Sequence, residues 1–253
     1  RARGLGIIGA AFGLGFIVGP AMGGFLSRYG LEVPAFVAAG LSLINLIAVA
    51  LWLPESLPPE DREVETSRRH PLNFKALHQA LTRPCAGPLL HVMLFYSLAF
   101  TLFQSNFALF TKERLGLDAQ STSFVLTYVG LLSVLVQGVA IGKLTDWLPE
   151  RTLVVGAAGL LTFSLIVWAF VPNVPLLLIV LAPTALSAGV LNVTLTSQLT
   201  KSVYQKEVGG VLGLSSSLQT LARIVSPGLG GGLMDLLGTW SVGLLAGLVM
   251  LWT

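Results

Sequence analysis

Hydrophobic residues gather into long runs along this chain instead of alternating with polar ones. A helix needs about 20 mostly apolar residues to cross a bilayer. Seven runs reach that length, and an eighth begins near Ser241 and stops at Thr253. Most connections are short, so neighbouring helices are expected to pack antiparallel. The pattern predicts an all-α integral membrane bundle with seven full spans and part of an eighth. The seven are residues 5–26, 33–53, 89–110, 121–144, 153–171, 175–198 and 208–237.

One connection differs from the others in length and polarity. Residues 54–87 are rich in proline and charged side chains in their first half, which indicates an exposed linker. In the second half Phe74, Leu77 and Leu81 recur at helical spacing among polar residues. This spacing predicts an amphipathic helix lying on the membrane surface.

Glycine and proline recur in the same order in the first and seventh runs. Each run has a proline followed three and four residues later by two glycines, and the two prolines are Pro20 and Pro227. Both runs begin on the same predicted side of the membrane, so this parallel repeat is typical of a protein built from two six-helix halves. Small residues let helix backbones approach closely in lipid. The candidates for such contacts are Gly15, Gly19, Gly23, Gly24, Gly230 and Gly231.

The repeat divides the chain into three segments. Residues 1–53 would be the last two helices of the N-terminal half, and residues 54–87 the loop between the halves. Residues 88–253 would be the C-terminal half with its last helix incomplete. The chain lacks an initial Met and ends inside an apolar run. We therefore expect it to be part of a longer protein in which four helices precede Arg1.

Composition supports a membrane protein. Hydrophobic residues make up 54% of the chain and charged residues 11%, whereas a soluble domain has about 25% charged residues. The single cysteine, Cys85, excludes an internal disulfide, and no metal-ligand spacing is present. We expect no cofactor and no nucleic-acid partner. The apolar runs contain no paired carboxylates, and the sequence has no nucleophile–base pattern. We therefore do not expect an enzyme.

The basic residues are distributed unequally between the two sides. Eleven lie on the side of the N-terminus and the long loop, and three lie on the other side. Because basic residues favour the cytoplasm, we expect the long loop to be cytoplasmic, in a bacterial inner membrane or a plasma membrane. The eleven are Arg1, Arg3, Arg62, Arg68, Arg69, Lys75, Arg83, Lys143, Arg151, Lys201 and Lys206, and the three are Arg28, Lys112 and Arg114.

Three stretches resemble the major facilitator superfamily. "GFIVGPAMGGFL" at residues 15–26 is similar to the helix-five motif of drug:proton antiporters, including the tetracycline efflux proteins. "GKLTDWLPER" at residues 142–151 resembles a loop motif of the superfamily, although Pro149 and Glu150 depart from it. "LPES" at residues 53–56 resembles the exit from helix six. The resemblance implies a truncated bundle of major facilitator type, covering helices five to twelve.

The same resemblance implies a function and a mechanism. The protein would export small organic molecules by alternating access, in exchange for protons, as a monomer in the lipid bilayer. Uptake of a metabolite, and a non-transporting sensor or scaffold on the same fold, remain alternatives. No carboxylate lies deep in a run. A coupling acid would therefore lie in the helices expected before Arg1.

Two motifs have both a structural and a gating interpretation. The glycines and prolines of the two repeat motifs would either pack helices or form a contact between halves that rearranges during transport. Gly142, Asp146 and Arg151 would form a cytoplasmic gate loop, or Asp146 and Arg151 would be a solvated pair of little energetic weight.

Polar residues inside the apolar runs are candidates for a substrate cavity. Arg223 stands out because an arginine near mid-membrane is costly without a partner or water. It would bind backbone carbonyls, recognise substrate charge or form a conformational ion pair. The amides would line the cavity or link helices by hydrogen bonds. The full set is Phe103, Gln104, Asn106, Phe107, Gln137, Asn192, Gln219 and Arg223.

Overall fold

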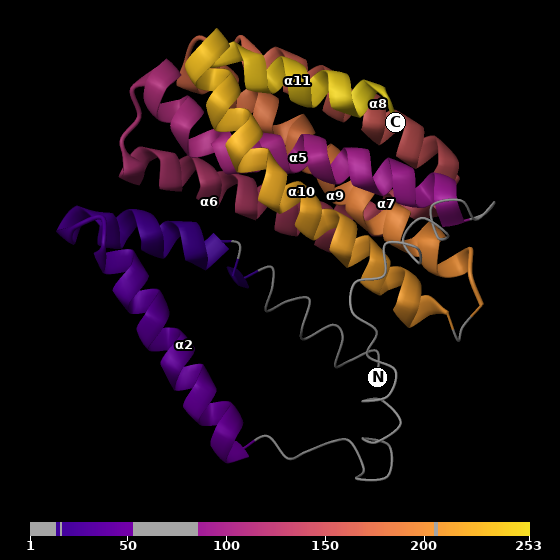
Figure 1. Ribbon diagram of the computed structural model, residues 1–253, viewed down its shortest axis with the longest axis horizontal. Helices are drawn as coiled ribbons and strands as arrows, with labels where there is room; N and C mark the ends of the chain where they lie inside the picture. The colour runs from indigo at the N-terminus through magenta and orange to yellow at the C-terminus, as the bar shows by residue number, and fades with distance from the viewer. Residues whose placement is uncertain (1–13, 16, 53–85, 205–206) are drawn as a thin grey trace.

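The computed structural model describes residues 14–15, 17–52, 86–204 and 207–253, and every regular element in these ranges is helical (Figure 1). Residues 17–26 are helical and continue into the 3-10 turn η1 (Ser27–Tyr29). The α-helices that follow are α2 (Val33–Trp52), α5 (Ala86–Leu115), α6 (Ala119–Leu135), α7 (Ile141–Trp147), α8 (Glu150–Ala169), α9 (Val174–Lys201), α10 (Val208–Leu237) and α11 (Trp240–Leu251). A π-helical turn, η2 (Val136–Ala140), joins α6 to α7.

The described helices confirm the predicted fold class. Six of them are long and apolar enough to cross a membrane, and they correspond to the predicted spans from 33–53 to 208–237. The predicted span 5–26 is described only at residues 14–15 and 17–26, and the predicted surface helix around Phe74 lies outside the described residues. Helix α11 covers 12 residues of the expected eighth span.

Local chemistry sets the helix boundaries at two of the tight connections. The Asp118 carboxylate accepts a hydrogen bond of 2.9 Å from the Ser121 backbone N–H and so caps the start of α6. Hydrogen bonding from Ser121 holds the pKa of Asp118 below its usual range. Gly116, with φ of +66°, provides the left-handed residue that ends α5 just before this cap. The side chain of Asn173 caps α9 in the same way, through the Leu176 N–H at 3.0 Å.

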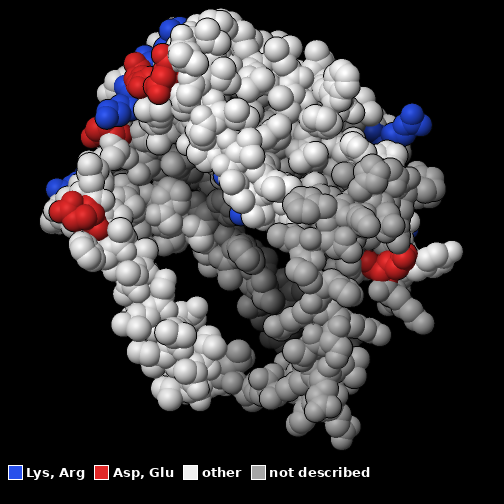
Figure 2. All heavy atoms as spheres, in the orientation of Figure 1, with Lys and Arg blue, Asp and Glu red and all other residues white. Residues whose placement is uncertain are grey.

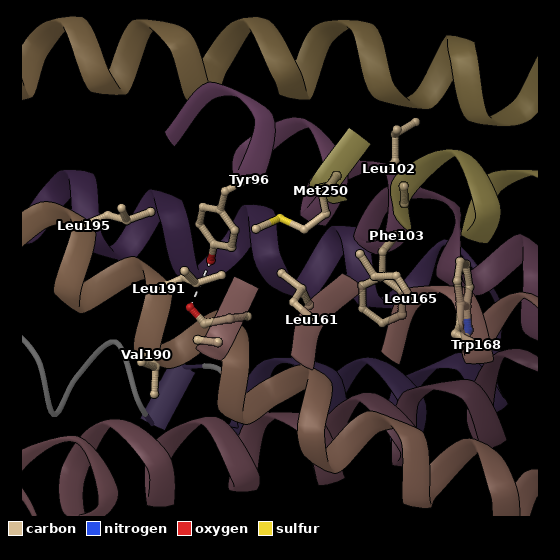
Figure 3. Close-up of a cluster of buried hydrophobic side chains, with 14 of the residues drawn as sticks. Tyr96, Leu102, Phe103, Leu161, Leu165, Trp168, Val190, Leu191, Leu195 and Met250 are labelled. Atoms are coloured by element: carbon tan, nitrogen blue, oxygen red, sulfur yellow. Dashed lines mark hydrogen bonds between the residues drawn. The ribbon is translucent and has the colours of Figure 1, made fainter. Parts of the chain in front are cut away.

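The hydrophobic core lies among α5, α8, α9 and α11 (Figure 3). Trp168 of α8 is fully buried among aromatic rings of α5, and its ring centroid lies 4.8 Å from that of Phe103 and 4.3 Å from that of Phe110. The Tyr96 hydroxyl donates a 3.0 Å hydrogen bond to the Ala188 carbonyl and so links α5 to α9. These contacts join α5 to α8 and α9, while α6 packs on α9, α10 on α5, and α11 on α5 and α8.

Helix α2 stands apart from this bundle (Figure 1). None of its residues is buried by the described part of the chain. The preceding residues 17–29 reach the bundle at α6. Figure 2 shows charged side chains gathered at the two ends of the bundle, an uncharged surface between them, and a few blue atoms inside the hollow. This banded surface is what a membrane-embedded bundle requires.

Candidate functional site

Helices α5 and α10 lie side by side and share a contact centred on Asn106. This side chain is 3% exposed, and its amide nitrogen donates to the Leu102 carbonyl at 3.0 Å and reaches the Ser226 carbonyl of α10 at 3.5 Å. A β-carbon added at Gly230 would overlap the same amide, with Oδ1 only 2.7 Å away. Gly230 therefore gives Asn106 room to contact α10 beside Pro227, a residue that removes one backbone donor from the helix.

Arg223 lies at the middle of α10, 15 residues after its first residue, which is about 22 Å along the helix axis. It is exposed, and no described residue bonds to it. Ser216, Gln219 and Thr220 precede it at spacings of seven, four and three residues, so these four residues share one face of α10. We call this the polar face of α10.

The register between the two helices fixes what lies at the level of Arg223. Ser215 contacts the Met93 sulfur at 3.6 Å, and Asn106 contacts Ser226, so positions at equal depth differ by 122 or 120 in number. Arg223 is therefore level with residues 101–103 of α5, next to the exposed Gln104. Gln104, Asn106, Gln219 and Arg223 therefore lie within about three helical turns of one another in depth, on two adjacent helices.

A second group of polar residues lies where α6 meets α9. Gln137 is exposed inside the π turn η2, and a β-carbon added at Gly189 of α9 would lie 2.9 Å from Val136 Cγ1 and 3.8 Å from Gln137 Cγ. Asn192 is exposed one turn further along α9. π-helical turns occur frequently at functional sites, and the sequence gives no periodic signal for this one.

Two of the predicted cavity residues belong to the core instead. Phe103 is 5% exposed and Phe107 is 1% exposed, and both contact the ring of Trp168. Their side chains fill the space between α5 and α8. The prediction that they line a cavity is therefore corrected, because aromatic side chains at this depth of α5 pack inward while Gln104 faces outward.

The glycine motif of the first span makes one close contact with the bundle. A β-carbon added at Gly24 would lie 2.5 Å from the β-carbon of Ser123 in α6. Equivalent atoms at Gly15, Gly19 and Gly23 would meet nothing described within 4 Å, and the same holds for Gly231. Pro20 is half-buried in the helix that carries the motif. Within the described residues, the glycine stripe at positions 15, 19 and 23 is therefore not the closely packed face, and Gly24 is.

The predicted gate loop is described, but its charges do not pair. Gly142, Asp146 and Arg151 are all exposed, and no described residue bonds to either charge. The ion pair in this region is Glu150 with Lys201, at 2.7 Å between Oε1 and Nζ, which joins the start of α8 to the end of α9. The Ser197 hydroxyl donates to the same Glu150 oxygen at 3.1 Å. Glu150 is one of the two residues that depart from the loop motif, and that departure was its only signal in the sequence.

Two buried polar atoms lack a hydrogen-bond partner among the described residues, Trp168 Nε1 and Ser226 Oγ. Ser226 is 0% exposed and adjoins both Pro227 and the Asn106 contact. Neither atom could be identified from the sequence, because burial on a uniformly apolar helix leaves no periodic pattern. No metal-binding group of His, Cys, Asp or Glu occurs in the described part of the chain.

Fold and site together define a multi-pass α-helical membrane protein with a polar helix face at mid-membrane depth. A family model described as Major Facilitator Superfamily matches residues 1–227. The chain belongs to the Major Facilitator Superfamily.

Curated relatives agree with this family. The chain is 29% identical over 237 residues to Solute carrier family 22 member 18 of Rattus norvegicus, covering 91% of the chain and 57% of the relative. It is 28% identical to Multidrug resistance protein 2 of Bacillus subtilis (strain 168), covering 93% and 59%. It is also 28% identical to Tetracycline resistance protein, class B, of Escherichia coli, covering 90% and 56%. The chain thus spans less than two thirds of the length of each of these relatives.

Proposed function

We propose that the protein is a secondary transporter that exports small organic molecules by alternating access, in exchange for protons. The observation that carries this proposal is Arg223, a charged side chain at the middle of an apolar helix, exposed beside Ser216, Gln219 and Thr220. An ionisable residue at this depth faces a water-filled path or a bundle interior. Relatives named for multidrug and tetracycline resistance favour export.

The mechanism that we propose is rocking of two helical halves about a midplane site. Residues 1–53 would belong to one half and residues 88–253 to the other, with residues 54–87 as the cytoplasmic loop between them. Gly24 and Ser123 would then form part of the contact between halves. Asp146 and Arg151, both exposed, would pair only in a state with the cytoplasmic side closed.

Substrate would bind between α5, α6, α9 and α10. The lining groups in this proposal are Gln104, Gln137, Asn192, Gln219 and Arg223, with Asn106 holding α5 against α10. The carboxylates of the described spans lie near helix ends, so we assign the proton-carrying acid to another part of the protein. The protein would work as a monomer, without a cofactor.

The experiment is transport by the full-length protein in proteoliposomes with an imposed pH gradient. The probes are ethidium, tetracycline and N-dansylphenylalanine, which differ in charge. We expect at least one to be transported, and collapse of the gradient to stop its movement. Transport that continues without the gradient would contradict proton exchange, and transport of none would contradict the export function. Movement only in the uptake direction would favour metabolite import.

A further inference from the structure

Acidic residues of the described chain all lie away from the middle of the membrane. Each one lies outside the membrane-length helices or within three residues of a helix end. They are Glu32, Glu113, Asp118, Asp146, Glu150, Glu207 and Asp235. Among described residues, Arg223 is therefore the single charge near the middle of a span. Among the described residues, the formal charge at this depth of α5 to α11 is therefore one guanidinium.

This guanidinium has no counter-charge within reach among the described residues. No described residue forms a hydrogen bond or an ion pair with it. Asp235 is the next acid along α10, but it lies 12 residues away, which is about 18 Å along the axis. A guanidinium held at mid-membrane depth is costly unless an anion or water satisfies it. Its planar donors match a carboxylate in a two-point contact.

The surroundings of Arg223 suit the rest of an amphiphilic ligand. Thr220 and Ser216 add hydroxyl groups on the same face, and Gln104 adds an amide from α5 at nearly the same depth. Exposed apolar side chains of α10 flank this face, with Ile224 70% exposed and Leu221 45% exposed. A ligand with an apolar body and one anionic group would match both kinds of surface, whereas Arg223 would repel the charged group of a cation.

We propose that Arg223 binds the anionic group of an amphiphilic organic acid, so that organic anions are substrates of this transporter. The inference rests on the proposed transport function and adds the sign of the substrate's charge. Gln219 is tied back by its own 3.3 Å hydrogen bond to Ser215. Thr220 is tied similarly, to the Ser216 carbonyl at 2.9 Å. Arg223 is thus the charged side chain of the polar face, and no described residue bonds to it.

The test uses two probes that differ by one methyl group and one negative charge, N-dansylphenylalanine and its uncharged methyl ester. Binding of each to the full-length protein in nanodiscs is measured by fluorescence anisotropy. We expect the wild type to bind the acid at least about tenfold more tightly than the ester, as charge-assisted hydrogen bonds imply. Arg223→Gln should abolish this preference by weakening the acid alone, and Arg223→Lys should keep part of it. Arg114→Gln, an exposed arginine at the outer end of α5, is the matched control and should change neither.

Three results would overturn the inference. Equal loss of both probes in Arg223→Gln would indicate a structural ion pair with another segment of the protein. No change in either probe would show that Arg223 is not at the site, and failure of the wild type to prefer the acid would reject an anion site. If Arg223→Gln does not fold, the preference for the acid over the ester is measured in Arg223→Lys instead. Transport of N-dansylphenylalanine that is unchanged in Arg223→Gln would contradict this inference while leaving the export function intact, whereas transport of no probe would contradict the function itself.

Discussion

At the scale of single residues, one glycine decides how closely α5 and α10 approach. Gly230 leaves the space that the Asn106 amide occupies, and Asn106 in turn reaches the Ser226 carbonyl. Gly228 lies half a turn away on the same helix, and a β-carbon there would meet nothing within 4 Å. Substitutions at these two glycines can therefore distinguish the effect of close packing from the effect of backbone flexibility at nearly the same depth of α10.

Replacing Gly230 with alanine should destabilise the protein by about 1–3 kcal/mol, because the added methyl group overlaps the Asn106 amide. Gly228→Ala should be neutral or stabilising by up to about 1 kcal/mol, because alanine is the better helix former. Thermal unfolding of the full-length protein in detergent measures both. Adding Asn106→Ala to Gly230→Ala should recover part of the loss, and equal effects of the two glycine variants would refute the contact.

Sequence reasoning located the polar candidates but could not orient the aromatic ones. Phe103 and Gln104 are adjacent, yet Phe103 is buried against Trp168 and Gln104 is exposed. Lipid and protein core are equally apolar, so a membrane helix gives no periodic signal that separates its two faces. A charged residue such as Arg223 can be identified as a candidate from the sequence alone, because a charged side chain is energetically costly in lipid and therefore rare there.

At the scale of helices, the π turn η2 interrupts the α-helical hydrogen bonding of the span from Ala119 to Trp147 and divides it into α6 and α7. Gly189 of α9 lies against Val136 at the start of this turn. The hydrophobic runs predicted this span and its neighbours, since length and apolarity are enough to define them. They could not predict the turn, because an extra residue per turn changes neither quantity.

Gly189→Ala should loosen the packing of α9 on the π turn, because its methyl group would lie 2.9 Å from Val136 Cγ1. We expect a loss of about 1–3 kcal/mol in unfolding free energy. Val136→Ala in the same chain should restore part of it. Gly156→Ala on α8, where nothing lies within 4 Å, serves as the control. A stable Gly189→Ala protein would contradict this packing.

The ion pair between α8 and α9 belongs to the same scale and should be weak. The side chains of Lys201 and Glu150 are 68% and 30% exposed, so solvent screens their attraction. Glu150→Gln should cost about 0.2–1 kcal/mol at low salt and nothing measurable at about 1 M salt, where charges are screened within about 3 Å. A large loss that persists at high salt would mean that Glu150 holds the helices by other contacts.

At the scale of the whole molecule, two groups of helices meet at a small contact. Residues 17–29 reach α6 where Gly24 lies against Ser123, while α2 leaves the bundle with no buried residue. The sequence repeat predicted two halves, and the motif in the first of them predicted a close contact. The motif could not indicate which glycine makes the contact. Its four glycines lie on one short helix, and the sequence does not show which of them faces the neighbouring helix.

We propose that these two groups of helices move against each other across the Gly24–Ser123 contact during transport. The most direct test is a disulfide between Gly24→Cys and Ser123→Cys in the full-length protein, with Cys85 replaced by serine. The two β-carbons would lie 2.5 Å apart, closer than the roughly 3.5–4.5 Å of an unstrained disulfide, so the helices must separate by about 1–2 Å for the bond to form. We predict that oxidation forms the cross-link and stops probe transport in proteoliposomes, and that a reductant restores it. A cross-linked protein that transports at the full rate would contradict the account.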